Sequence, residues 1–172
     1  KAQPDRPRYT AELARSAHNL GVLFAATQRL PQAETQHREA LTLREKLVAA
    51  FPQETEHRPD LARSHAELAI VQALRNNLKA SEENFKQSLA LLQKSMESRP
   101  EDVRLLRERI TQEDNFARLL AALGREDEAL RHWRKRIELL ELQPRESATY
   151  RAAVAQAQFE LALQLNQVGR KS

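Results

Sequence analysis

Apolar and small residues recur along the chain with the spacing of amphipathic helices, and prolines stand near the points where one helix gives way to the next. A 3.6-residue period predicts packing stripes on the first two segments, formed by Leu13, Ala17, Leu20, Leu23 and Phe24 and then by Ala33, Ala40, Leu41 and Leu47. Proline is tolerated in a first helical turn because its missing N–H has no partner there. The pattern predicts helices over residues 7–28, 31–50, 58–77, 79–98, 101–123, 126–142 and 146–168.

The pattern returns at an interval of 48 residues. Residues 13–16 (Leu-Ala-Arg-Ser) reappear at residues 61–64, and a small residue is kept at Ala33, Ser81 and Ala129. A ring stands at one further register, occupied by His37, Phe85 and Trp133. Small residues opposite bulky ones let two antiparallel helices approach closely. We therefore expect an array of repeated helix pairs.

This array is predicted to be a single domain over residues 1–172. Its repeat units cover about 7–54, 55–100 and 101–143, and residues 144–172 form a partial unit or a capping helix. The last helix carries a predicted packing stripe formed by Val154, Ala157, Leu161, Leu165 and Val168. Phe159 and Leu163 lie on another side of it, so this end is apolar on two sides. Either a following helix covers it, or the chain self-associates through this C-terminal helix.

Composition agrees with helices and removes several kinds of chemistry. The 172 residues are 41% hydrophobic and only 5% aromatic, with many Ala, Leu, Glu, Gln and Arg, which favour helices. The absence of cysteine excludes disulfides, cysteine-ligated metals and thiol nucleophiles. The net charge of +4 is spread evenly, so we expect no nucleic-acid partner, with binding through arginine-bearing faces as an alternative.

No apolar run is long enough to span a bilayer and no signal peptide is visible, so we expect no membrane partner and a cytoplasmic location. The chain begins with Lys1 instead of Met, which predicts a fragment of a longer protein. The five histidines include no His-Glu-x2-His pair, and no glycine-rich loop could cradle a phosphate. His37 is best interpreted as a packed core residue. We therefore predict a protein that is not an enzyme, with no catalytic residue, no metal site and no cofactor.

The sequence Leu20-Gly21-x2-Phe24, followed by Ala33, His37 and Ala40, resembles the tetratricopeptide repeat (TPR). Residues 122–129 (Ala-Leu-Gly-Arg-Glu-Asp-Glu-Ala) followed by Trp133 resemble it again. The 48-residue period exceeds the usual ~34 and is similar to the long repeats of kinesin light chains. Residues 40–48 also resemble arrays attached to bacterial serine/threonine protein kinases of the planctomycete type. The resemblance implies an all-α, right-handed superhelical solenoid of antiparallel helix pairs, with about seven helices.

In TPR arrays the first helix of each pair lines a concave groove, so the resemblance also implies a binding surface. By register its residues here are Arg15, His18, Asn19, Val22, Arg63, Glu67, Ile70, Leu74, Thr111, Asp114, Asn115 and Arg118. The set lacks the Lys/Asn/Arg pattern with which chaperone-binding TPR domains hold a C-terminal carboxylate. The amides of Asn19 and Asn115 can each donate and accept, which suits the backbone of an extended peptide.

The predicted function is therefore a non-catalytic protein–protein interaction scaffold. It would bind an extended peptide or a partner helix in the groove. The alternative is a regulatory or oligomerisation segment of a larger signalling protein such as a serine/threonine kinase.

Overall fold

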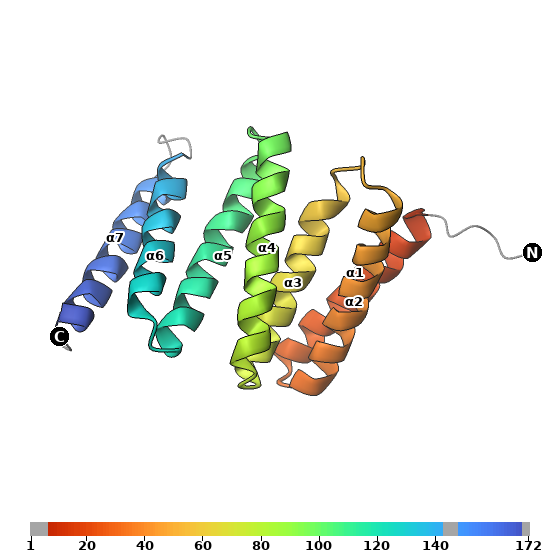
Figure 1. The fold of residues 1–172 in the computed structure, drawn as a ribbon, viewed down its shortest axis with the longest axis horizontal. Coiled ribbons are helices and arrows are strands. Elements are labelled where there is room, and N and C mark those ends of the chain that lie inside the picture. Colours follow the sequence, from red (N-terminus) through yellow and green to blue (C-terminus); the bar gives the residue numbers. More distant parts are fainter. Residues whose placement is uncertain (1–6, 143–147, 170–172) are drawn as a thin grey trace, which may run out of the picture. The chain divides into compact units, whose positions relative to one another are not determined.

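The computed structural model describes residues 7–142 and the backbone of 148–169, with side chains from 152 to 166 in that last stretch. Within these ranges the chain forms seven α-helices and no strand (Figure 1). They are α1 (Pro7–Ala26), α2 (Leu30–Ala50), α3 (His57–Leu74), α4 (Leu78–Ser98), α5 (Val103–Ala122), α6 (Glu126–Glu141) and α7 (Ala148–Gly169). Each helix end lies within three residues of its predicted position. The all-α class and the repeat of helix pairs are confirmed.

Consecutive helices pack on one another within two compact units, Lys1–Arg99 and Pro100–Ser172. In the first unit α1 packs on α2, α2 on α3 and α3 on α4. In the second unit α5 packs on α6, and α6 packs on α7. The boundary between the units coincides with the predicted start of the third repeat. One continuous array over residues 1–172 stays a prediction.

The turn inside each helix pair is built in the same way three times. Gln28, Asn76 and Gly124 stand 48 residues apart, and all have a positive φ, of 60°, 61° and 71°. In each turn the next backbone N–H reaches back five residues, as from Arg29 to the Phe24 carbonyl oxygen at 2.8 Å. Such a left-handed residue closes a helix by satisfying its last carbonyls. Glycine adopts a positive φ without strain, whereas glutamine is strained in this conformation.

The predicted close-approach positions lie in the core. Ala33, Ser81 and Ala129 are fully buried, and the Ser81 hydroxyl donates to the Ala69 carbonyl oxygen at 2.8 Å. The rings at the next register (His37, Phe85 and Trp133) are buried too. His37 lies against Gly21, where a Cβ would come within 2.7 Å of the imidazole. The predicted stripe on α2, from Ala33 to Leu47, is confirmed as buried.

The predicted packing stripe on α1 is wrong for its leucines. Ala14, Ala17 and Gly21 are the buried residues of this helix, whereas Leu13, Leu20 and Leu23 are exposed. The small residues face α2, and the leucines lie on a second side that no described helix covers. On α7 the prediction is correct for Ala157, which is buried, and wrong for Leu165, which is exposed; the Val168 side chain lies outside the described residues.

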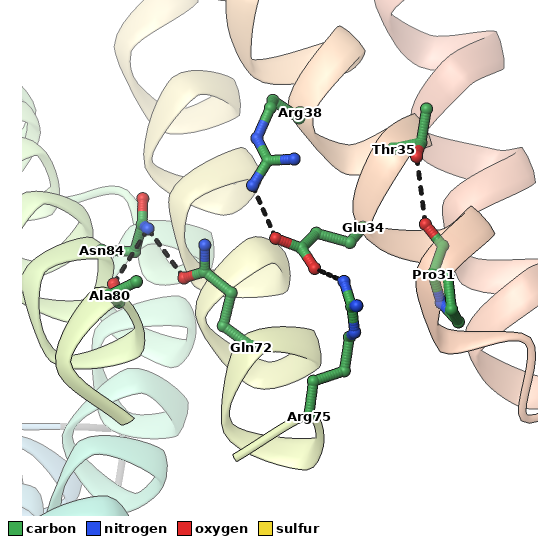
Figure 2. A network of polar contacts seen from close by, with 8 residues as sticks. All are labelled: Pro31, Glu34, Thr35, Arg38, Gln72, Arg75, Ala80 and Asn84. Atoms are coloured by element: carbon green, nitrogen blue, oxygen red, sulfur yellow. Dashed lines mark hydrogen bonds and ion pairs between the residues drawn. The ribbon is translucent and has the colours of Figure 1, made fainter. Parts of the chain in front are cut away.

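Two neighbouring sets of polar contacts join α2 to the end of α3 and α3 to α4 (Figure 2). The buried carboxylate of Glu34 accepts hydrogen bonds from Arg75, just beyond α3, and from Arg38, at 2.5 Å. Burial raises the pKa of Glu34, but the hydrogen bonds from both arginines outweigh it and hold the pKa below its usual range. Beside this carboxylate, the Asn84 amide on α4 donates to the Gln72 side-chain oxygen on α3 at 3.0 Å. These contacts fix the register of three consecutive helices.

Candidate peptide-binding surface

The twelve residues predicted to line a groove all lie on first helices of the pairs, and none of them is buried. Eight belong to the first unit: Arg15, His18, Asn19 and Val22 on α1, and Arg63, Glu67, Ile70 and Leu74 on α3. Four belong to α5 in the second unit: Thr111, Asp114, Asn115 and Arg118. Their accessibility is what a binding surface requires, while their use by a ligand stays a prediction.

The arginines of this surface are paired with acidic residues one turn earlier on the same helix. Arg15 contacts Glu12 at 2.6 Å, and its repeat equivalent Arg63 contacts Asp60 at 3.5 Å. On α5, Arg118 contacts Asp114 at 2.8 Å, and this hydrogen bond raises the pKa of the Arg118 guanidinium. The surface therefore presents ion pairs. Proteins that bind the phosphate backbone of nucleic acids instead present positive charge without acidic partners.

The two asparagines differ from the charged members of the set. Neither the Asn19 nor the Asn115 side-chain amide hydrogen-bonds to another group in the described part of the chain. Asn19 is exposed and Asn115 is partly exposed. Each amide can therefore donate to and accept from an incoming backbone without first breaking a contact.

His18 belongs partly to the surface and partly to the core. Its ring meets the buried His37 ring edge-on, with the centroids 5.8 Å apart. Burial lowers the pKa of His18, and the charges of Arg44 and Arg63 lower it further. The lowered pKa favours the neutral form of this imidazole, which lies at the edge of the surface one helical turn before Val22.

In the second unit an arginine links three helices. Arg136 on α6 contacts Asp114 on α5 at 2.8 Å and Glu160 on α7 at 2.7 Å. The hydrogen bond from Arg136 lowers the pKa of Glu160, although burial opposes it. By the 48-residue period Arg136 corresponds to Ala40 and Ser88, which are small and fully buried. The two carboxylates explain how a large cation is accommodated at this register.

Next to this cluster lies an open hollow of about 260 Å³, lined by Arg118, Ala121, Trp133, Glu160 and Gln164. Its walls come from α5 and α7, and Trp133 of α6 contributes an aromatic side chain. Of these residues only Arg118 belongs to the predicted set. Glu160 stands 45 residues after Asn115, the spacing that also relates residues 123–125 to 168–170, so the repeat register could have identified it.

The part of the chain that the structure describes lacks two common functional features and contains one further hollow. No group of three or more His, Asp or Glu side chains among them is arranged to hold a metal ion. Nor does any helix in the described ranges combine the length and the apolar character that crossing a membrane requires. A larger hollow of about 450 Å³ borders Thr35, Arg38, Glu39, Thr42, Leu43 and Lys46, all from α2, so it is an open shelf along one helix.

Helix pairs in a regular repeat, with accessible first-helix faces, define a helical-repeat scaffold. Residues 13–54, which contain most of α1 and all of α2, match the family model described as the tetratricopeptide repeat. This match supports the predicted family, whose repeats generally mediate protein–protein interactions and are generally non-catalytic. No curated protein matches the chain.

Proposed function

We propose that the chain is a protein-interaction scaffold that binds an extended peptide segment along the first-helix faces of its repeats. The observation that carries this proposal is the hollow beside Trp133, because it combines a concave shape, an aromatic wall and accessible polar groups. An aliphatic or aromatic side chain of the peptide would enter this hollow and meet the part of the Trp133 ring that lines it, since the rest of the ring is buried. In the second unit the peptide backbone would be held by the amide of Asn115. In the first unit the equivalent amide of Asn19 would serve a peptide that binds on α1.

The chemistry of the surface favours a peptide over a nucleic acid. Its arginines are balanced by Glu12, Asp60 and Asp114, and the surface also includes exposed apolar side chains such as Val22 and Leu74. Mixed apolar and paired charged groups suit a peptide with apolar and acidic side chains. The resemblance to kinase-attached arrays would place this interaction in a signalling protein.

The test is selection of peptides from a displayed random library on the full chain, followed by calorimetric titration of the selected peptides. We expect Asn19→Ala, Arg63→Ala and Asn115→Ala together to weaken binding at least tenfold, through lost backbone and side-chain contacts. The matched control replaces Thr35, Thr42 and Lys46 on the outer shelf of α2 by alanine and should leave affinity unchanged. Equal affinity of both variants would contradict the proposed surface.

Self-association is a second candidate, and the exposed apolar residues of α7 favour it. Phe159 and Leu163 are 64% and 44% exposed, one turn apart on a solvent-facing side of α7. If they form an interface between copies, sedimentation should show a concentration-dependent dimer. Phe159→Asp with Leu163→Asp should then return the chain to a monomer, whereas a wild-type monomer at every concentration would contradict this candidate.

A further inference from the structure

The exposed leucines of α1 form an apolar stripe on a different side from the proposed peptide surface. We use "α1 stripe" for Tyr9, Leu13, Ser16, Leu20 and Leu23, which recur at helical spacing along one side of the helix. The helix packs on α2 through Ala14, Ala17 and Gly21, so the stripe is not part of that interface. Tyr9 and Leu23 are more than half exposed, at 68% and 57%. Adjacent exposed apolar side chains of this kind mark a contact surface.

The repeat shows what such a stripe binds. One period of 48 residues later, Leu13, Leu20 and Leu23 become Leu61, Leu68 and Val71 of α3. The residues of α3 are only 6%, 3% and 1% exposed. Leu61 and Leu68 form one cluster with Leu41 of α2, and Val48 of α2 and Leu91 of α4 pack against this cluster. The same face is thus exposed on α1 and covered by a helix on α3.

A polar contact within the covered interface also has its counterpart on α1. Arg44 of α2 is buried, and its Nη1 donates to the Ser64 hydroxyl at 2.7 Å and to the Asp60 carbonyl oxygen at 2.9 Å. Ser64 corresponds to Ser16, which is exposed and donates its own hydroxyl hydrogen to the Glu12 carbonyl oxygen at 3.0 Å. The Ser16 oxygen therefore keeps lone pairs that can accept from a guanidinium.

From this correspondence we propose that the α1 stripe docks one amphipathic α-helix of a partner protein, in the way that α3 docks α2. The partner helix carries aliphatic side chains at two positions seven residues apart, in the places of Leu41 and Val48. Between them it carries an arginine, in the place of Arg44, that reaches Ser16. This surface is separate from the peptide-binding surface proposed above, and the two can be tested independently.

The correspondence between α1 and α3 fails at one position, and this difference predicts which residues of the partner helix contribute to binding. In the covered interface Arg75 pairs with Glu34 of α2, but the register of Arg75 is occupied on α1 by Thr27. The Thr27 hydroxyl donates to the Leu23 carbonyl oxygen at 2.9 Å and offers no positive charge. A glutamate in the place of Glu34 therefore adds nothing to binding at the α1 stripe, whereas the arginine in the place of Arg44 does.

The probe for this docking is a fluorescein-labelled peptide with the sequence of residues 30–51, titrated with the full chain and followed by anisotropy. We expect saturable binding that is at least tenfold weaker for the Arg44→Ala peptide and unchanged for the Glu34→Gln peptide. A chain with Leu20→Asp and Leu23→Asp should lose binding with little change in its melting temperature, because both side chains are exposed. The control chain, with Phe159→Asp and Leu163→Asp, should bind as the wild type does.

A gain-of-function variant completes the experiment. Thr27→Arg should strengthen binding of the original peptide severalfold without strengthening that of the Glu34→Gln peptide. Three results would overturn the proposal: no saturable binding, binding that survives Leu20→Asp with Leu23→Asp, or a wild-type dimer that forms through the stripe. The second result would mean that the peptide replaces α2 within the chain. Retained peptide docking in the Asn19, Arg63 and Asn115 alanine variant separates this surface from the proposed groove.

Discussion

His37 differs from its repeat equivalents, Phe85 and Trp133, because its buried ring can take up a proton. The ring is fully buried, and neither of its nitrogens hydrogen-bonds to another described residue. Burial lowers its pKa from about 6.5 to about 4, and electrostatic interactions with His18 and Arg44 lower it further. A protonated imidazole at this position would be an uncompensated cation in the core. The neutral ring acts as an aromatic packing residue, as the sequence predicts.

Acid should therefore destabilise the chain through His37. Between pH 6.5 and about 4 the unfolded state binds a proton that the folded state does not, so stability falls as the pH drops through this window. The shift corresponds to a loss of up to about 3 kcal/mol. We expect His37→Phe to lose less stability than the wild type between pH 7.5 and pH 4.5 in urea titrations. Equal losses in the two proteins would show that other groups cause the acid sensitivity.

Gly21 and His37 should behave as a coupled pair. A Cβ on Gly21 would meet the fully buried His37 ring at 2.7 Å, so the ring or the backbone would have to shift. We expect Gly21→Ala to destabilise by roughly 1–3 kcal/mol, despite the better helix propensity of alanine. The second repeat combines Ala69 with Phe85 at these registers. In a double-mutant cycle His37→Phe should recover part of the loss, and additive effects would contradict the coupling.

Among the helix-pair connections, the three left-handed turns show how one element can be built from different residues. Gly124 meets the positive φ without a Cβ, Asn76 tolerates it, and Gln28 adopts it under strain. The three turns nevertheless share one hydrogen bond. In each, the backbone N–H that follows the positive-φ residue donates to the carbonyl oxygen five residues earlier. Packing of the helix pair therefore determines the positive-φ conformation of the turn. The residue type at that position determines only the conformational strain.

This difference predicts a stabilising substitution. Gln28→Gly should raise the free energy of unfolding by about 0.5–1 kcal/mol, since relief of the left-handed strain exceeds the entropy that glycine adds to the unfolded chain. Gly124→Gln is the reverse change at the equivalent turn and should destabilise by a similar amount. Urea unfolding of both variants checks the pair, with Gln28→Ala as the control that should bring no gain. A destabilised Gln28→Gly chain would show that the glutamine side chain matters there.

The whole molecule divides at Arg99 and Pro100 into two units, each with its own helix–helix interfaces. In repeat proteins the stability is close to a sum of repeat terms and nearest-neighbour interfaces. The first unit keeps three interfaces and the cluster around Leu41, Leu61 and Leu68. A cut between α2 and α3 would divide that cluster, whereas a cut at residue 99 would leave it whole.

We therefore expect residues 1–99 to fold as an isolated fragment. Circular dichroism should show helical content with one cooperative thermal transition. The control fragment, residues 1–54, exposes Leu41 and leaves Arg44 without Ser64, so it should melt gradually or at a much lower temperature. Loss of the cooperative transition in residues 1–99 would show that the second unit is needed for the first to fold.

Much of this architecture could be predicted from spacing alone, because helical periodicity and repeat register are local properties of a chain. The buried small residues at Ala33, Ser81 and Ala129 follow from these two periods. The accessible set from Arg15 to Arg118 follows from the resemblance to the tetratricopeptide repeat. The place of Arg136 could not be predicted in this way. Arg136 breaks the pattern for a small residue, and it fits only because Asp114 and Glu160 approach it from neighbouring helices.

The α1 stripe shows what the sequence alone could predict and what required the tertiary structure. Helical spacing places Leu13, Leu20 and Leu23 on one apolar face of α1. The 48-residue period places Leu61, Leu68 and Val71 on the equivalent face of α3. Only the packed structure showed that one face is exposed and the other covered. The periodicity of a helix states which residues share a side. Whether that side is buried depends on whether another helix lies against it, and this is a property of the assembled fold.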